Sequence, residues 1–448
     1  MHEHHSHAQD RPHRHHYDAG MLSVEDARDR ILSYFEPLDS VDVPLLDAVG
    51  LTLAEDLTAG FDIPPLANSA MDGYAVKSAD VASASKFNPV LLPVLGYIAA
   101  GDVPQMPLSE GSAVRIMTGA PVPEGADAVV PFEDTDEEDR RSNGGDISEI
   151  GIRLDAESGD NIRPAGEDVR AGQTVIEYGA EITAGVVGVA ASLGKTSVQA
   201  IRRPVIAIVS TGDELMEPGE RREPGKIYNS NAYSIAALVE KYGGIARIIG
   251  IARDSIESLE TMLEEAVEND MVVTSAGVSK GDYDVVKDVL SKNGEIALWS
   301  VRMRPAKPLA FGALNAPDGR KVPHLGVPGN PVSAMVAFEQ FGRPAIRVML
   351  GKAPLQKPTI TATLDDPVYN HDGRRVYARV DVYKDDAGNY RARSTGNQSS
   401  GALHSMALAR GFAICPDDVA SVPAGTDAVV EILEWPDDDL LSDRIDHS

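Results

Sequence analysis

Cysteine is almost missing from this chain, since Cys415 is the only one in 448 residues. A single thiol forms no internal disulfide, which fits the reducing cytoplasm. Long hydrophobic runs are missing as well: none approaches the ~18–20 apolar residues that span a bilayer, and no signal peptide opens the sequence. We therefore expect a cytoplasmic protein without a membrane partner.

Positive charge is the second shortage. The chain has 41 Lys and Arg against 69 Asp and Glu, which gives a net charge of -28. A surface this acidic repels nucleic acid and anionic membranes, because both bind proteins through basic patches. An anionic ligand must therefore be held by local devices such as helix N-termini, glycine-rich loops and a few basic side chains.

What the sequence does contain is typical of a soluble multidomain protein. Hydrophobic residues make up 43% and charged residues 25%, and at about 150 residues per domain the length predicts roughly three domains. Residues 1–20 hold most of the 11 histidines. They form either a metal-handling segment or, the interpretation we favour, a plain disordered tail. Residues 437–448 form a second, acidic tail.

Between the tails, the pattern of apolar residues changes along the chain and predicts the fold class. Residues 61–149 contain short strands broken by Gly and Pro, which predict a small β domain. Residues 203–352 alternate strands and helices, which predicts a central αβα three-layer domain with a largely parallel sheet. Residues 353–436 return to short strands and predict a β-barrel. The fold class is multidomain α/β plus β.

Some local boundaries follow from single residues. Ser23, Thr183 and Asp254 each precede a helical pattern and are predicted N-caps. The acidic, glycine-rich residues 135–146 are predicted to form an exposed loop.

Loops that follow the predicted α/β strands are the first candidates for a site, because ligands of such sheets bind at the carboxyl ends of the strands. In Ser210–Leu215 (STGDEL), hydroxyls and a glycine let the backbone approach an anion, and the carboxylates suit a metal. In Ser275–Asp284 (SAGVSKGDYD), glycines, serines and a lysine suit phosphate, and Asp282 suits Mg²⁺. Neither motif is specific alone, because glycine-rich turns are common and Asp282 is an equally ordinary helix cap.

Two further stretches suit an anion. In Pro328–Ala334 (PGNPVSA), Asn330 as N-cap and Pro331 at the first helical position explain the motif structurally, and the same geometry leaves N–H groups free for an anion. In Arg302–Pro308 (RMRPAKP), cations in so acidic a protein suit an oxyanion, with surface ion pairing as the alternative.

The β domain contains two ambiguous loops. Asn68–Ala75 (NSAMDGYA) is either a structured functional loop or a plain turn centred on Asp72 and Gly73. Local physics alone favours the turn. Thr118–Pro121 (TGAP) has the same ambiguity.

Together these stretches resemble the molybdopterin molybdenumtransferase family, which includes the C-terminal domain of gephyrin. They occur in the family's order and span the chain from about residue 21 to 435, so that the set is far more specific than any member. The matching stretches are NSAMDGYA (68–75), RIMTGAPVPEGADAVV (115–130), NIRPAGEDV (161–169), STGDEL (210–215), SAGVSKGDYD (275–284), KPLAFG (307–312), PGNPVSA (328–334) and TGNQSSG (395–401).

The resemblance implies an elongated homodimer. Residues 21–60 and 150–202 would form its dimerisation domain, residues 203–352 would bind adenylylated molybdopterin, and the β lid of the partner subunit would close over the site. The implied reaction is Mg²⁺-dependent hydrolysis of the adenylate, insertion of molybdate into the pterin dithiolene, and release of AMP. The upstream adenylyltransferase is a further partner that the resemblance suggests.

Residue roles carry over by position. The resemblance implies that Asp72 and Thr118 act from the lid loops as catalytic residues, together with Glu214 and Asp282. Glu214, Asp254 and Asp282 would form the acidic cluster for Mg²⁺ and the adenylate. The other implied substrate-binding residues are Thr211, Gly212, Ser275, Gly277, Ser279, Gly281, Arg304, Lys307, Pro328, Gly329, Asn330 and Ser400, of which Arg304, Lys307 and Ser400 would serve the oxyanion.

The chain departs from the family pattern in two loops. Relatives usually carry Lys or Gln followed by Pro-Gly-Lys where this chain has Arg304, Pro305, Ala306 and Lys307, and alanine in place of glycine limits backbone freedom. In the second loop, Ala276 stands where relatives often have a glycine, and Lys280 adds a charge.

Two other functions stay open. A molybdopterin adenylyltransferase shares the α/β domain and the GVSKGD-type loop, but it lacks the lid and the C-terminal β domain. A non-catalytic protein that stores the cofactor or scaffolds a partner is opposed by the presence of Asp72, Thr118, Glu214 and Asp282.

Overall fold

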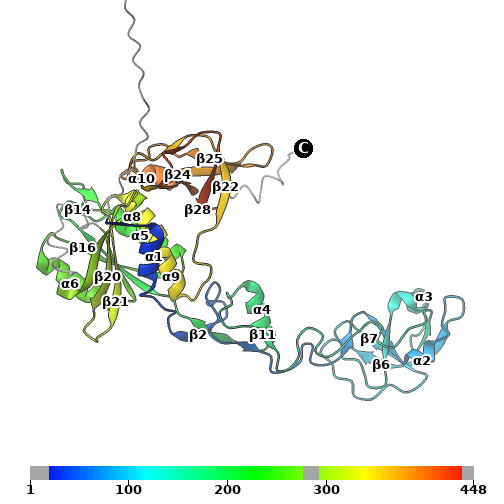
Figure 1. Cartoon of the computed structure of the whole chain (residues 1–448). Helices are drawn as coiled ribbons and strands as arrows, with labels where there is room; N and C mark the ends of the chain where they lie inside the picture. The colour runs from blue at the N-terminus through cyan, green and yellow to red at the C-terminus, as the bar shows by residue number, and fades with distance from the viewer. Residues whose placement is uncertain (1–19, 276–291, 436–448) are drawn as a thin grey trace, which may run out of the picture. The chain divides into compact units, whose positions relative to one another are not determined.

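The computed structural model describes residues 20–275 and 292–435 (Figure 1). The chain forms two compact units, each with hydrophobic cores of its own. The large unit comprises Met1–Asp42, Gly50–Thr52 and Gln199–Ser448, and the small unit comprises Val43–Val49 and Leu53–Val198.

A seven-stranded sheet lies at the centre of the large unit, in the order β1-β18-β20-β21-β17-β13-β16. Neighbours from β21 to β16 are parallel, whereas β20 is antiparallel to both β21 and β18. Every residue of β13 except the half-buried Val205 is buried, as its continuous apolar run predicts. The strands are β1 (Met21–Leu22), β13 (Val205–Thr211), β16 (Ile245–Ala252), β17 (Met271–Ser275), β18 (Gly294–Val301), β20 (Pro308–Asn315) and β21 (Lys321–Val327).

Helices cover both faces of this sheet. From β13 the chain passes through α5 (Ser230–Lys241) to β16 on one side, and then through α6 (Ile256–Ala266) to β17 on the other. Ile235 of α5 packs in one core and Leu259 of α6 in another, on opposite sides of β13. The strand order therefore switches direction between β13 and β17, where ligands of open α/β sheets bind. On the α5 face lie α1 (Val24–Leu32), α8 (Pro331–Ala337), the π-helix η2 (Phe338–Gly342) and α9 (Arg343–Met349).

A closed β-barrel forms the C-terminal part of the large unit, because β24 pairs with both β25 and β26. The short strand β19 (Met303–Arg304), which belongs to the loop after β18, adds to β24 and joins that loop to the barrel. The elements of this part are β22 (Thr359–Leu364), β23 (Val368–Tyr369), β24 (Arg375–Lys384), β25 (Tyr390–Ser394), α10 (Leu403–Ala407), β26 (Gly411–Cys415), β27 (Ser421–Val422) and β28 (Asp427–Ile432).

The small unit contains a five-stranded sheet in the order β8-β5-β7-β6-β9. Its strands are β5 (Gly73–Val76), β6 (Val90–Ile98), β7 (Ala113–Ile116), β8 (Ala128–Pro131) and β9 (Glu149–Ile152). The other elements of the small unit are β3 (Leu57–Thr58), β4 (Asn68–Ser69), α2 (Ser78–Val81), η1 (Phe132–Asp134), α3 (Glu137–Ser142), β10 (Ile162–Arg163), β11 (Thr174–Ile176) and α4 (Ala184–Ser192). Outside these groups lie β2 (Ser40–Pro44), β12 (Ser197–Ile201), β14 (Leu215–Met216) and β15 (Ile227–Tyr228).

The predicted fold class, α/β plus β with a barrel, is confirmed, but two local predictions are wrong. The N-cap of α6 is Ser255, whose Oγ accepts from the Ser258 amide at 3.2 Å, and not Asp254. Residues 135–146 contain the helix α3 because Glu137 is buried and accepts a hydrogen bond of 2.6 Å from the Tyr74 hydroxyl. The alternation of strands and helices in the sequence also predicts a helix at about 285–290, which lies outside the described residues.

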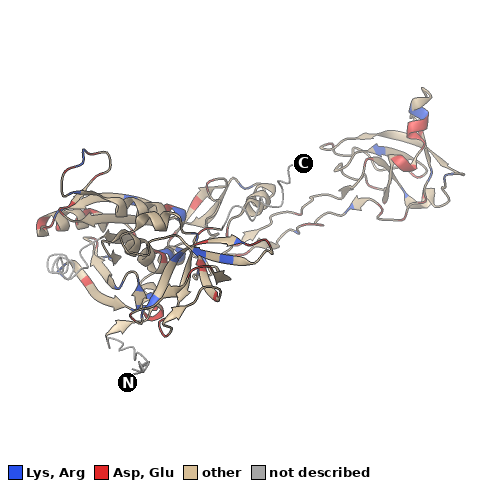
Figure 2. Cartoon of the chain, turned by 90° about the horizontal axis from the view of Figure 1, so that it is seen from above, with Lys and Arg blue, Asp and Glu red and all other residues tan. Residues whose placement is uncertain are grey.

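Charge is spread over both units. In Figure 2 the basic residues are dispersed among acidic ones along many different elements. Among the described residues, no helix combines the length and apolar character needed to cross a membrane.

A buried ion pair joins the helices of the α/β sheet to the segment that leads into the barrel. The side chains of Lys357 and Glu339 contact each other and are 5% and 1% exposed. The Tyr242 hydroxyl lies 2.8 Å from both carboxylate oxygens of Glu339. Removal of one partner from such a pair leaves an uncompensated charge away from water.

We expect Lys357→Met to lower the free energy of unfolding by about 3–5 kcal/mol, because the Glu339 carboxylate would lose its cation while staying buried. Urea unfolding followed by circular dichroism measures this change. The matched control is Lys321→Met, whose pair with Glu295 is 54% and 79% exposed and should contribute less than about 1 kcal/mol. Equal unfolding midpoints for the two variants would contradict the prediction.

Candidate active site

A cavity of about 1750 Å³ opens in the large unit between the sheet and the barrel. It exceeds the ~300–1,000 Å³ of a typical small-molecule pocket, so it has room for a ligand with more than one ring system. Glu214, Ser275 and Asn330 line it from the sheet side, and Arg379 and Ser400 line it from the barrel side.

The cavity lies where the sheet topology predicts a ligand. Glu214 follows β13, Ser275 ends β17, and Pro328, Gly329 and Asn330 follow β21, and all five residues line the cavity. These parallel strands point their carboxyl ends toward the same edge of the sheet, next to the switch point between β13 and β17. Three loops that are far apart in sequence thereby meet at one site.

A buried polar network fixes these loop ends. The Asn231 side-chain amide donates to Ser275 Oγ at 2.7 Å and to the Gly329 carbonyl at 2.8 Å. Two residues earlier, at the N-cap of α5, Asn229 Oδ1 accepts a hydrogen bond of 2.9 Å from Ser210 Oγ. Sequence reasoning missed Asn231. The signal available was a second asparagine in the first turn of a helix that Asn229 already caps.

The Arg304–Lys307 loop lines the cavity, and the pairing of β19 with the barrel strand β24 holds it there. Arg304 pairs with Val376 of β24, and its guanidinium lies 3.7 Å from the Asp372 carboxylate. Ala306 is buried and has φ of 76°, a left-handed conformation that costs an alanine roughly 1–2 kcal/mol. The Lys307 side chain lines the cavity and has no hydrogen-bond or ion-pair partner in the part of the chain that is described. Its charge is therefore available to a ligand.

Arg379 is the second available cation, and sequence reasoning missed it. It is 1% exposed, and its Nε donates to Ser405 Oγ at 2.8 Å, while Nη2 donates to the carbonyls of Asn397 and Ser399 at 2.9 and 3.1 Å. Burial lowers the pKa of Arg379 to about 10, which still leaves the guanidinium charged at neutral pH. No carboxylate among the described residues pairs with it.

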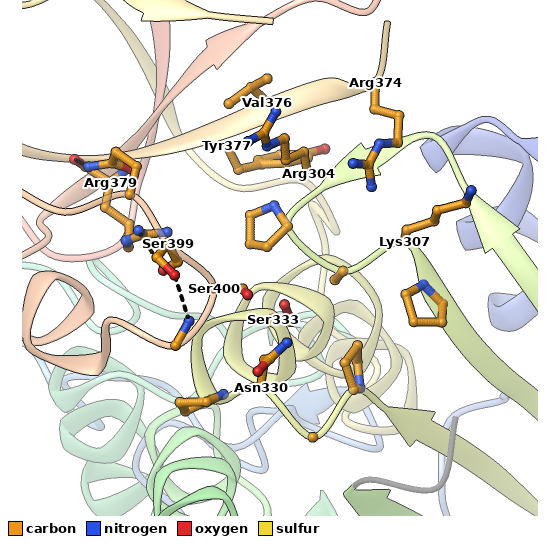
Figure 3. A pocket seen from close by; sticks show the side chains of 18 of the residues that line it. Arg304, Lys307, Asn330, Ser333, Arg374, Val376, Tyr377, Arg379, Ser399 and Ser400 are labelled. Atoms are coloured by element: carbon orange, nitrogen blue, oxygen red, sulfur yellow. Dashed lines mark hydrogen bonds between the residues drawn. The ribbon is translucent and has the colours of Figure 1, made fainter. Parts of the chain in front are cut away.

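Figure 3 shows how these groups converge. Ser333 and Ser400 lie between Lys307 on one side of the cavity and Arg379 on the other. The Val332 amide donates to the Ser400 carbonyl at 3.0 Å and holds the barrel loop against α8. Two cations and two hydroxyls around one space suit a tetrahedral oxyanion.

The carboxylates predicted for Mg²⁺ are placed in different ways. Glu214 lines the cavity. Asp254 does not; it exchanges amide-to-carboxylate hydrogen bonds of 3.3 and 3.4 Å with Asp213. The third carboxylate, Asp282, lies outside the described residues, within which no three metal-binding side chains gather.

Of the other predicted substrate-binding residues, two lie next to the cavity without lining it, and three lie outside the described residues. Thr211 is buried, and its hydroxyl donates to the Ser275 carbonyl at 3.4 Å. Gly212 has φ of 141°, and a Cβ there would overlap the Glu214 carboxylate. Neither residue lines the cavity. Gly277, Ser279 and Gly281 lie outside the described residues.

In the small unit the structure brings Asp72 and Thr118 together. Both the amide and the hydroxyl of Thr118 donate to Asp72 Oδ1 at 2.7 Å. The loops meet because Gly73 pairs with Ile116 in the antiparallel ladder of β5 and β7. The amide bond first, and the hydroxyl bond second, lower the pKa of Asp72 below its ordinary value of 3.8.

We expect Thr118→Val to raise the pKa of Asp72 while leaving it below its ordinary value, because the amide bond stays. A carboxylate whose pKa is lowered in the folded state stabilises that state above its unfolded pKa, and this contribution disappears as the pH falls through the folded pKa. The variant should therefore lose stability above that acidic range and match the wild type below it. NMR titration of the Asp72 carboxyl carbon measures the pKa, with Thr118→Ser as the control that keeps the hydroxyl. An unchanged pKa in Thr118→Val would refute the assignment.

Comparison with known proteins identifies the family. Models described as the MoeA N-terminal region (domain I and II), the probable molybdopterin binding domain and the MoeA C-terminal region (domain IV) match residues 22–194, 207–348 and 361–433. Molybdopterin molybdenumtransferase 2 of Mycobacterium tuberculosis is 37% identical over 91% of this chain and 98% of that protein. Molybdopterin molybdenumtransferase of Staphylococcus epidermidis is 33% identical over 92% of this chain and 95% of that protein.

A solved structure agrees with these matches. The molybdopterin biosynthesis MoeA protein from Pyrococcus horikosii superposes with a TM-score of 0.79 at 29% identity, covering 93% of this chain and 100% of that chain. Fold and site thus define a multidomain protein of the MoeA type, with a molybdopterin-binding α/β domain. The chain belongs to the molybdopterin molybdenumtransferase family.

Proposed function

We propose that this chain is a transferase of molybdenum-cofactor biosynthesis, which inserts molybdate into adenylylated molybdopterin with release of AMP. The observation that carries the proposal is the pair of cations, Lys307 and Arg379, that line one cavity without an acidic partner among the described residues. Acidic residues outnumber basic ones by 69 to 41 in this chain. Burial of a charged arginine without a carboxylate costs free energy, unless a bound anion neutralises the guanidinium.

The proposed chemistry divides between the two ends of the substrate. At the diphosphate, water adds to phosphorus and AMP leaves. At the dithiolene, the two thiols form two Mo–S bonds and two molybdate oxygens leave as water, with two of the four protons coming from the thiols and two from the solvent. Lys307, Arg379 and the hydroxyls of Ser333 and Ser400 would hold the oxyanion in place. Such positioning converts a bimolecular encounter into a reaction between neighbours.

Mg²⁺ belongs to the proposal as well. Glu214 would hold it at the cavity, with Asp254 and Asp282 as the further ligands that the family resemblance implies. Mg²⁺ in proteins commonly uses one or two carboxylates and completes its shell with substrate phosphates and water, so Glu214 on the cavity wall fits. The ion would neutralise the charge on the diphosphate.

A homodimer is the third part of the proposal, supported by α4 of the small unit. This helix, AGVVGVAAS, is apolar on all sides, but only Val186 and Ala190 are buried. A helix that is apolar on all sides is normally buried. Leu46 and Tyr178 of the same unit are 81% and 60% exposed. We infer that a second copy covers this surface and that Asp72 and Thr118 act at the partner's cavity.

Sedimentation velocity at micromolar concentration should show a dimer for the wild type and a monomer for Gly188→Glu. Gly188 has nothing within 4 Å of its Cβ position, and glutamate has a higher helix propensity than glycine, so the folded monomer should tolerate the change. The control is Ala387→Glu in an exposed barrel turn. A monomeric wild type, or a Gly188→Glu variant that stays dimeric, would overturn the inferred interface.

A turnover assay tests the proposed function itself. The protein is mixed with adenylylated molybdopterin, Mg²⁺ and molybdate, and AMP release and cofactor formation are followed. We expect molybdate-dependent AMP release, lost in Asp72→Ala and lowered about 10- to 100-fold in Lys307→Met and Arg379→Met, since each removes a charged hydrogen-bond donor. Arg410→Met is the control, because Arg410 pairs with Asp381 away from the cavity.

Other outcomes of this assay would favour the alternatives. Tight binding of the adenylate without AMP release would support a storage or scaffold protein. Formation of the adenylate from ATP and molybdopterin would support an adenylyltransferase, which the matches to the MoeA N-terminal and C-terminal regions oppose.

A further inference from the structure

Two aromatic rings are stacked on the barrel side of the cavity. The ring centroids of Tyr369 and His371 are 5.8 Å apart, their planes differ by 11°, and both residues line the cavity. The other close ring pairs of the described residues are tilted or edge-on, with angles of 36° to 87°. Tyr369 is 56% exposed. Within the described residues, neither ring has a hydrogen-bond partner.

The backbone holds this pair rigidly. Asn370, between the two rings, is 3% exposed. Its amide donates to the Ala420 carbonyl at 2.8 Å, its Nδ2 donates to the Pro416 carbonyl at 3.0 Å, and its Oδ1 accepts from the Gly373 amide at 3.0 Å. Asn370 is thereby fixed away from the cavity, whereas Tyr369 at the end of β23 and His371 in the bend that follows both line it. The ring surface is therefore formed before any ligand binds.

Positive charge borders this ring surface. Arg304 and Arg374 both contact Asp372, the residue after His371, so one carboxylate faces two guanidiniums. Arg374 also donates to the Met303 carbonyl at 3.3 Å, which holds the Arg374 side chain at the edge of the cavity. Four basic residues line the cavity, namely Arg304, Lys307, Arg374 and Arg379, and they outnumber its two acidic lining residues, Glu214 and Asp366, so the lining carries a net positive charge. A flat ring system that bears a phosphate is the kind of ligand that fits both features.

We propose that Tyr369 and His371 form a stacking platform for the flat heteroaromatic ring of a phosphorylated ligand, which is either the adenine or the pterin ring of the substrate. Heteroaromatic rings stack on aromatic side chains without needing specific hydrogen bonds. The cavity volume of about 1750 Å³ leaves room for a second ring system elsewhere in the same space. The choice of these two rings rests on the proposed function, whereas the stacked geometry and the net positive charge of the lining do not.

Isothermal titration calorimetry with three probes tests the platform. The probes are AMP, a pterin phosphate without the adenylate, and ribose 5-phosphate, which has the phosphate but no ring. We expect Tyr369→Ala and His371→Ala each to weaken binding of one ring-bearing probe about tenfold, the scale of one lost stacking contact. Binding of ribose 5-phosphate should not change.

Two control variants separate stacking from general damage. Tyr369→Phe keeps the ring and should bind within about twofold of the wild type. Trp435→Ala removes an aromatic residue that is 51% exposed and does not line the cavity, and it should have no effect. Thermal unfolding of each variant confirms that the barrel is intact.

The probe that loses affinity identifies the ring that stacks. Unchanged binding of both ring-bearing probes in Tyr369→Ala and His371→Ala would overturn the proposal, as would a failure of the wild type to bind either probe. An equal loss for ribose 5-phosphate would also overturn it, because the effect would then not come from stacking. These measurements need no turnover, so a failed transfer assay and a failed platform give different results.

Discussion

The side-chain amide of Asn231 links the two loop ends, at Ser275 and Gly329, that form the sheet side of the cavity. It donates to Ser275 at the end of β17 and to Gly329 after β21, from the first turn of the helix that follows β13. The three elements are neighbours in space, but Asn231 and Gly329 are 98 positions apart in the chain. Hydrogen bonds that are shielded from water are expensive to break, because the freed donors and acceptors find no other partner. The network therefore fixes the ends of β17 and β21 against α5 at the base of the cavity.

The cavity is completed by the barrel. Strand β19 adds to β24, which brings Arg304 and Lys307 to the cavity that Arg379 and the serines of the barrel loop also line. Cations gather here in a chain that is strongly acidic overall. Long-range repulsion of anions by the net charge is screened by salt within about 10 Å, so Lys307 and Arg379, which have no acidic partner among the described residues, can attract an anion at close range.

Aromatic and charged groups occupy different parts of the same cavity. Ser333 and Ser400 lie between Lys307 and Arg379 (Figure 3). The stacked rings of Tyr369 and His371 line the barrel side, and the next residue, Asp372, contacts Arg304 and Arg374. A large cavity with an oxyanion-sized polar centre and a flat aromatic wall suits a substrate in which rings are joined by charged groups. This division fits the proposed reaction, in which the diphosphate and the dithiolene of one substrate react at different places in the cavity.

The strands and loops of the α/β domain could be predicted from the sequence because their signals are local. The alternation of strands and helices over residues 203–352 was predicted from the sequence, and Thr183 was predicted as the N-cap that it is in α4. The helix α3 was missed because Glu137 is held by Tyr74, 63 positions away, and by Arg115, 22 positions away. Arg379 was missed for a similar reason, since an arginine in a strand usually points to water.

The sequence by itself determined the family, the fold class and several of the loop residues that line the cavity, because motifs and apolar periodicity depend on near neighbours. Only the tertiary structure decided which charges stay unpaired and which rings stack. Nothing in the sequence distinguishes Lys307 and Arg379 from other basic residues. In the structure, by contrast, Arg302 lies near Asp417 and Arg410 lies near Asp381. Burial and pairing are properties of the surroundings that distant segments create, and no local pattern contains them.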